Sequence, residues 1–214
     1  TGGNVSFYNE SQDGPVKPTP TIGMVGLIDD VDLAVKGNFQ KSGDLIYLAG
    51  HFAPSFGGSE YLWLKEKIVR GDLPALDLNH ETSLVRFLVA GSKEKLFHSA
   101  KDLSLGGIAA ALFKCSYEPK NRAVTGFHLN SELGAVYGSG KRSDLLYFGE
   151  TNGCALISVD PSSASRMEEL ARQFGLPAVR IGSVGGEVLD FGAFRADGLH
   201  CAALYERGLS FAFE

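Results

Sequence analysis

Long apolar runs and an excess of basic residues are missing from this sequence of 214 residues. A membrane-spanning helix needs roughly 20 consecutive apolar residues, and no stretch approaches that length. The opening stretch does not resemble a signal peptide either. The formal net charge is −5, whereas general binders of nucleic acid or anionic membranes need a concentrated basic face. We therefore expect neither nucleic acid nor a membrane as a partner.

Cysteine is scarce as well. Cys115, Cys154 and Cys201 are odd in number and far apart, so they fit neither a zinc site nor a disulfide framework. We expect free thiols in a reducing cytoplasm, and a cytoplasmic location for the protein. The histidines lack a metal-binding spacing such as HExxH, and GxSxG is absent, so a hydrolase triad has no support. We expect each of the five histidines to lie on the surface or to be hydrogen-bonded in the core: His51, His80, His98, His128 and His200.

Glycine and apolar residues are abundant. The sequence holds 27 glycines, which predict many tight turns, and 44% of its residues are hydrophobic, enough to bury a core. The length fits one large or two small domains.

The opening stretch, TGGNVSFYNE, carries the most chemical information. Gly3, preceded by another glycine, lets the backbone approach a ligand closely. Asn4 offers an amide oxygen to a hard cation, and the Ser6 hydroxyl can bond a phosphate or sugar oxygen. Apolar and polar residues alternate over residues 5–8, so a strand there would aim Asn4 and Ser6 to one side. A plain turn followed by a capped or solvated strand explains the same residues.

Elements further along follow from periodicity and capping. Ser59 is a predicted N-cap for a helix that Gly71 ends, and Asp160-Pro161 is a predicted start for a helix that Gly175 ends. A second helix is expected at residues 80–90. Strands are expected at residues 21–28, 44–49, 124–129, 144–148, 155–159, 178–183, 187–191 and 209–213.

A second suggestive stretch surrounds Asp102. There Ser104, Gly106 and Gly107 precede the helix-forming run IAAALF, so backbone N–H groups at a helix start could meet an anion. A capped helix whose glycines permit close packing is the competing interpretation. Because strands outnumber helices, we expect an α+β fold, with helices on one face of a mixed or antiparallel sheet.

Taken together, the motifs resemble phosphoribosylformylglycinamidine synthase, in the synthetase subunit of that family. They run in the family's order over essentially the whole chain: TGGNVSFYNE at Thr1, PTPTIGMVGLIDDV at Pro18, SGDLIYLAG at Ser42, FGGSEYL at Phe56, SAKDLSLGGIAAAL at Ser99, YFGETNGCALISV at Tyr147 and RIGSV at Arg180.

The resemblance implies that the chain, which begins without methionine, is the last third or so of a longer protein. Residues 1–40 would be the last part of the second domain of the aminoimidazole-ribonucleotide-synthetase type, present here as a remnant of two strands. Residues 41–214 would form the related C-terminal domain. The rest of the polypeptide would then be a partner of this part.

The implied reaction uses ATP and Mg²⁺ to activate the amide oxygen of formylglycinamide ribonucleotide. Ammonia made from glutamine, by a glutaminase domain or subunit with or without a small bridging subunit, then gives the amidine. By the resemblance Gly3 contacts ATP, Asn4 binds magnesium and Ser6 contacts the substrate. The catalytic histidines, the ATP-binding lysine and the other acidic ligands would lie outside this chain, which should be inactive alone.

The resemblance also implies an auxiliary nucleotide site at Asp102, Gly106, Gly107 and Glu150. The family's usual sequence at this position is closer to SAHDVSDGG, so the chain departs from it at Lys101 and Leu105. Cys154 also stands where arginine is common, which weakens the case for an anion.

Two other hypotheses stay open. The chain could be a non-catalytic module that binds nucleotide or docks a glutaminase partner. It could also belong to another branch of the superfamily, such as aminoimidazole ribonucleotide synthetase, thiamine-monophosphate kinase or selenophosphate synthetase. GGNVSFYNE with PTP favours the synthase over those branches.

Overall fold

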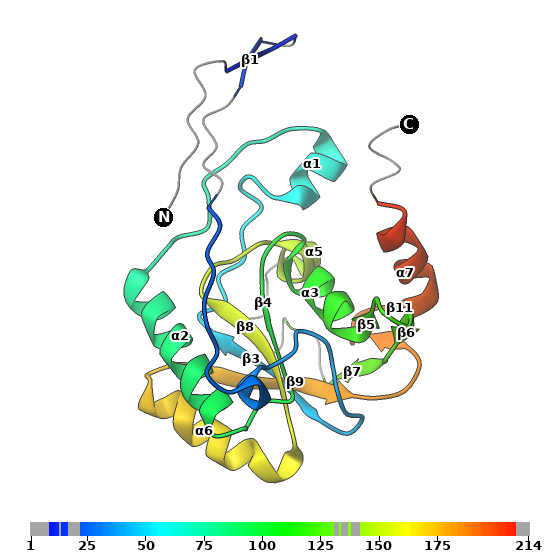
Figure 1. The fold of residues 1–214 in the computed structure, drawn as a ribbon. Helices are drawn as coiled ribbons and strands as arrows, with labels where there is room; N and C mark the ends of the chain where they lie inside the picture. The colour runs from blue at the N-terminus through cyan, green and yellow to red at the C-terminus, as the bar shows by residue number, and fades with distance from the viewer. Residues whose placement is uncertain are drawn as a thin grey trace. The chain divides into compact units, whose positions relative to one another are not determined.

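The structure, a computed structural model, describes residues 9–12, 14–16, 22–130, 133, 137 and 142–208. The chain divides into two compact units, Thr1–Val31 and Asp32–Glu214, and each is described by itself. Figure 1 shows their elements. No helix in the described ranges is both long and apolar enough to cross a membrane.

The first unit contains a small antiparallel pair, β1 (Glu10–Ser11) and β2 (Gly14–Pro15). The Ser11 hydroxyl donates to the Gly14 carbonyl at 3.0 Å and closes the turn. A two-strand opening is therefore confirmed, but its strands differ from those predicted. The predicted strand at residues 5–8 lies outside the described residues.

Residues 22–28 of the predicted strand at 21–28 are not a strand. Val25 and Leu27 are 98% and 96% exposed, respectively. A strand needs a hydrogen-bonded neighbour, and the described part of the chain supplies none to this run.

The second unit is built on a mixed sheet with the strand order β11-β10-β7-β9-β3-β8-β4. Its described strands pair antiparallel except for β10 with β7, which are parallel. The strands are β3 (Leu45–Gly50), β4 (Ser99–Asp102), β7 (Phe127–Leu129), β8 (Cys154–Val159), β9 (Ala178–Val184), β10 (Leu189–Asp190) and β11 (Arg195–Ala196). A separate hairpin joins β5 (Tyr117–Glu118) to β6 (Ala123–Val124).

Helices cover both faces of this sheet (Figure 1). On one face, Ile46 and Leu48 of β3 pack in a core with α3 (Gly107–Ser116) and α5 (Ser143–Phe148). On the other, Tyr47 and Ala49 pack in a core with α2 (Leu78–Lys93) and α6 (Ala164–Gln173). The predicted α+β class and mixed sheet are confirmed, whereas the expectation of helices on one face is wrong. The reason is that β3 and β8 are apolar on both sides, so each side needs a cover.

The predicted cap at Ser59 and the predicted helix start at Asp160 are confirmed. The Ser59 hydroxyl accepts from the Leu62 N–H and begins α1 (Glu60–Glu66), which ends at a left-handed Lys67 rather than at Gly71. Asp160 caps the short 3-10 helix η2 (Pro161–Ser163) that leads into α6. The remaining elements are η1 (Val31–Leu33) and α7 (Gly198–Glu206).

Several predicted strands change. Residues 144–148 form helix α5, because a short apolar run such as LLYF fits either period. Residues 124–129 divide between β6 and β7, and the strand predicted at 187–191 shortens to β10. Residues 209–213 lie outside the described residues, and α7 was not predicted.

Candidate functional site

The three residues of the predicted ATP, magnesium and substrate contacts, Gly3, Asn4 and Ser6, lie outside the described residues. Their assignments stay predictions.

The predicted auxiliary site falls where the loop before β8 meets the start of α3. The Glu150 carboxylate accepts hydrogen bonds from the backbone N–H of Gly106 at 3.1 Å and of Glu60 at 3.0 Å. Backbone bonds between Ser55 and Glu150, at 2.9 and 2.8 Å, hold the loop in place. Glu150 therefore joins the starts of α1 and α3 with a single carboxylate oxygen.

Gly106 and Gly107 are required by this geometry. Both have positive φ, 81° and 67°, which side chains other than glycine rarely adopt. A Cβ on Gly107 would stand 2.6 Å from the carbonyl oxygen of Gly149. The glycines let α3 begin against the backbone of the loop that carries Glu150.

Asp102 is engaged differently. Its exposed carboxylate ends β4 and forms an ion pair with Lys101. The Lys101 ammonium lowers the pKa of this carboxyl more than desolvation raises it. The structure thus brings together Gly106, Gly107 and Glu150, and places Asp102 just before them in an ion pair of its own.

This arrangement has a chemical consequence for anion binding. N–H groups at helix starts attract phosphate or carboxylate. Here Glu150 accepts from two of those donors. A nucleotide phosphate that used these N–H groups would have to displace the Glu150 side chain, or reach it through a cation.

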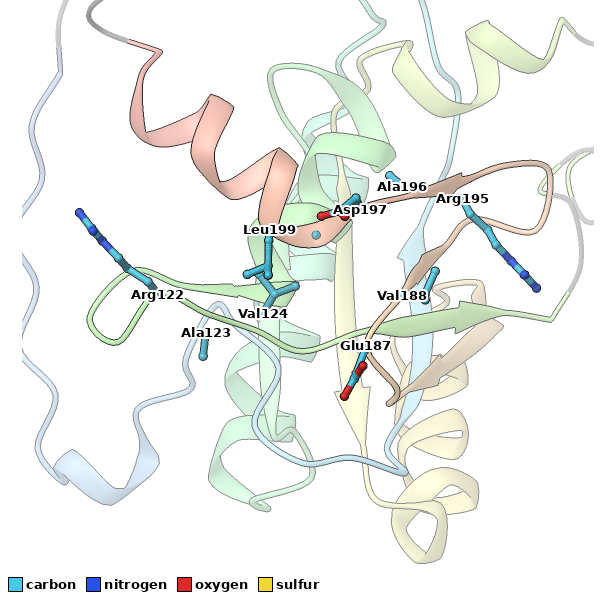
Figure 2. A pocket seen from close by; sticks show the side chains of 10 residues that line it. Arg122, Ala123, Val124, Glu187, Val188, Arg195, Ala196, Asp197 and Leu199 are labelled. Carbon is cyan, nitrogen blue, oxygen red and sulfur yellow. The ribbon is translucent and has the colours of Figure 1, made fainter.

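A groove of about 860 Å³ lies elsewhere, between the β5–β6 hairpin, β11 and the start of α7. Figure 2 shows the side chains of Arg122 and Arg195 at opposite ends of it, pointing away from each other. Each guanidinium already has a carboxylate partner, Glu206 and Asp190 respectively, through Nε at 3.0 Å. The groove therefore lacks a converging pair of free cations.

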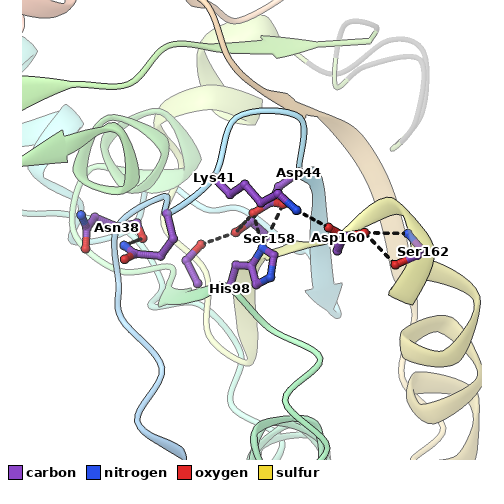
Figure 3. A network of polar contacts seen from close by, with 9 residues as sticks. Asn38, Lys41, Asp44, His98, Ser158, Asp160 and Ser162 are labelled. Carbon is purple, nitrogen blue, oxygen red and sulfur yellow. Dashed lines mark hydrogen bonds and ion pairs between the residues drawn. The ribbon is translucent and has the colours of Figure 1, made fainter. Parts of the chain in front are cut away.

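Sequence reasoning missed a polar network at the ends of β3, β4 and β8 (Figure 3). The Asp44 side chain is fully buried, and both of its oxygens lie within 2.9 Å of His98 Nδ1. Asp160 lies beside it, ion-paired to Lys41 at 2.5 Å. No spacing signal could have found this cluster, because His98 is 54 residues from Asp44 and Lys41 is 119 from Asp160.

Comparison with known proteins gives consistent results. The family model described as AIR synthase related protein, C-terminal domain, matches residues 41–191. The chain is 41% identical over 191 residues to phosphoribosylformylglycinamidine synthase subunit PurL of Chlorobaculum tepidum, covering 87% of this chain and 25% of that protein. It is 42% identical over 166 residues to PurL of Gloeobacter violaceus, covering 75% of this chain and 20% of that protein.

Solved structures show the same fold. Thermotoga maritima PurL complexed with FGAR matches with a TM-score of 0.62 at 21% identity, over 81% of this chain and 30% of that one. The same protein complexed with AMPPCP gives a TM-score of 0.60 at 17% identity, over 81% and 28%. The chain thus spans about a quarter of the length of the curated relatives it matches.

Proposed function

This chain belongs to the AIR synthase related protein family, whose C-terminal domain it carries, and from that premise we propose that it is part of a phosphoribosylformylglycinamidine synthase. The synthase would use ATP to convert formylglycinamide ribonucleotide and ammonia to the amidine. The observation that supports this most is the identity of about 40% to PurL subunits over nearly nine tenths of the chain.

The opening stretch supplies the reactive contacts in this proposal. By the family resemblance, Asn4 would hold the magnesium ion and Ser6 would contact the substrate. Their chemistry is compatible with these roles, because an amide oxygen is a hard donor to Mg²⁺ and a hydroxyl can bond a phosphate or sugar oxygen. Gly3 would bring the backbone against ATP without a Cβ in the way. Bound magnesium would stabilise the charge that builds on the phosphoryl oxygens during transfer. These residues would position the amide oxygen of the substrate for phosphorylation.

The remaining catalytic groups belong, in this proposal, to polypeptide beyond this chain. The chain covers about a quarter of the relatives' length, which supports such a division. We expect it to be inactive alone and to work with the rest of the synthetase. A glutaminase domain or subunit, with or without a small bridging subunit, would deliver the ammonia.

The auxiliary nucleotide site remains a hypothesis within this proposal. For a bound nucleotide, Asp102 would offer its exposed carboxylate to a cation, and Gly106 would offer its backbone N–H once Glu150 moved away from it. Glu150 favours a second candidate function, a non-catalytic module for nucleotide binding or subunit docking. Its carboxylate already satisfies the donors that a phosphate would use, so the loop can serve as a structural joint.

The test is Asn4→Ala in the complete synthase, assayed for amidine formation across a magnesium titration. We expect turnover to fall at least about tenfold at limiting magnesium, because one ligand to the ion is lost, while the thermal midpoint stays unchanged. Asn9→Ala is the matched control, since Asn9 is an exposed asparagine of the same stretch. Equal losses of turnover and thermal midpoint, or equal behaviour of the two variants, would show that Asn4 has no role in metal binding.

A further inference from the structure

The geometry points to a second metal site, unrelated to the opening stretch: we propose that Asp44, His98 and Asp160 bind a divalent transition-metal ion. Within the described residues, these three form the group whose ligand atoms lie close enough, with every pair inside 4.8 Å. Asp44 immediately precedes β3, His98 lies in the loop before β4 and Asp160 is the N-cap of η2; Figure 3 shows the three side chains converging.

The distances fit a coordination sphere. Ligands about 2.1 Å from an ion lie about 3 Å from one another in an octahedral arrangement. The Nδ1 atom of His98 lies 2.9 and 2.8 Å from the two oxygens of Asp44. An ion would therefore take the place of the proton that His98 and Asp44 share, and a small rotation of Asp160 would complete three protein ligands.

Hydroxyl groups orient the two carboxylates, as outer-shell partners do around metal ligands. Ser158 Oγ donates to Asp44 at 3.4 Å, and Ser158 is bonded in turn to Ser99 at 2.7 Å. On the other side, Ser162 donates through both its backbone N–H and its hydroxyl to one oxygen of Asp160. The second oxygen of Asp160 takes no hydrogen bond from Ser162.

The Lys41 ammonium forms an ion pair with this second oxygen of Asp160, at a distance of 2.5 Å from Nζ. Its ammonium is a tethered cation on a flexible stem, and its side chain is more than half exposed. It can therefore swing into solvent when a metal ion arrives. Metal binding then exchanges one cation for another, so Lys41 limits the affinity of the site without preventing occupation.

The donor set selects the class of metal. One imidazole with two carboxylates suits Zn²⁺, Co²⁺ or Mn²⁺, whereas Mg²⁺ prefers oxygen ligands alone. This chemistry separates the site from the magnesium role proposed for Asn4. Its place at the end of the central strand β3 indicates that a bound ion would tie β3, β4 and the start of η2 together.

A second histidine–carboxylate pair supplies the matched control. His128 Nδ1 lies 3.0 Å from Asp190, which also pairs with Arg195 at 3.0 Å. This pair copies the histidine, the carboxylate and the neighbouring cation. Among the described residues it lacks a second carboxylate within ligand distance.

The experiment measures Co²⁺ binding to the protein by visible absorption and Zn²⁺ binding by calorimetry. Both use a His51→Ala/His80→Ala background, which removes a stacked pair of surface imidazoles. We expect one ion per chain, with Asp160→Asn lowering its affinity at least about tenfold. Asparagine keeps the helix cap while removing the charge, so this variant should stay folded. His128→Ala should bind as the background protein does.

Removing the competing ammonium gives the opposite result. Lys41→Ala should raise the affinity roughly tenfold, because the ion no longer has to displace a cation. Two results would overturn the proposal: the absence of a Co²⁺ spectrum in both the background protein and Lys41→Ala, or equal affinities for Asp160→Asn and His128→Ala. Circular dichroism of each variant checks that the fold is retained.

Discussion

Residues 22–28 and strand β3 are comparably apolar, yet the first segment is exposed to solvent and the second is buried. Leu48 in β3 is 0% exposed, whereas Leu27 in the opening unit is 96% exposed. The difference lies in neighbours: β3 has β8 and β9 on its two edges and a helical layer on each face. Burial of apolar side chains is favourable, but it requires neighbouring strands and helices that exclude water from them.

An exposed apolar run of this length normally marks a surface that another chain covers. In the synthase proposed above, the rest of the synthetase would cover it. The comparison between Leu48 and Leu27 therefore predicts different costs of substitution, both in this chain and in the complete synthetase.

The largest effect should come from Leu48→Ala. It should lower the free energy of unfolding by about 2–5 kcal/mol, because it removes a fully buried side chain and leaves a cavity. Leu27→Ala in the same chain should change it by less than about 0.5 kcal/mol. Urea unfolding of both variants measures the difference, and similar losses would break the comparison. In the complete synthetase, the loss from Leu27→Ala should grow if the run is covered there.

An intermediate effect on stability is expected from alanine substitutions at two glycines of the second unit, one packed against backbone and one exposed. Gly107 and Gly175 both have a φ of 67°, but a Cβ on Gly107 would meet the Gly149 carbonyl at 2.6 Å, while nothing lies within 4 Å of one on Gly175. Both substitutions by alanine should cost about 1 kcal/mol from the left-handed backbone. Gly107→Ala should cost roughly 1–3 kcal/mol more, because backbone has to move.

Thermal unfolding of the two glycine variants checks this prediction. A loss for Gly107→Ala no larger than that for Gly175→Ala would show that the loop before β8 yields easily. The close approach of this loop to α3 would then not be a rigid feature of the predicted auxiliary site.

The smallest effect concerns the exposed ion pair of Lys41 and Asp160. The hydrogen bond from Lys41, followed by those from Ser162, lowers the pKa of Asp160 below its usual value of 3.8. A lowered pKa in the folded state adds stability above the unfolded value, and this is lost as the pH falls through the folded value. Asp160→Asn should therefore be slightly less stable than the parent at pH 7, and the difference should shrink below pH 3.8. Urea midpoints from pH 7 to pH 2 measure it; a difference that does not change with pH would contradict the linkage.

Local signals predicted part of the fold well. Ser59 was identified as a cap and Asp160 as a helix start, because the bonds that begin a helix reach N–H groups only two or three residues ahead, within one short stretch. Strands β3 and β8 were recognised because both are continuous apolar runs. Close packing was one of the two interpretations of Gly106 and Gly107, although Gly149, the neighbour of Gly107, was not foreseen.

Other features could not be predicted from local sequence. Residues 144–148 read as a strand, yet in the structure they form α5 and lie in one core with α3 and the sheet. Glu150 was predicted beside Gly106 and Gly107 through the family resemblance, but its role as a shared cap also depends on Glu60, from a helix 90 residues away.

By itself, the sequence determined the family, through motifs that resemble it in order along the chain. It also determined the α+β class, the buried central strands and the helix starts, because these depend on composition or on residues a few positions apart. The tertiary structure alone decided that helices cover both faces of the sheet and that Asp44, His98 and Asp160 converge. The physical reason is that packing and clustering join side chains far apart in the chain. Their partners are set by how strands and helices cross, which no local spacing records.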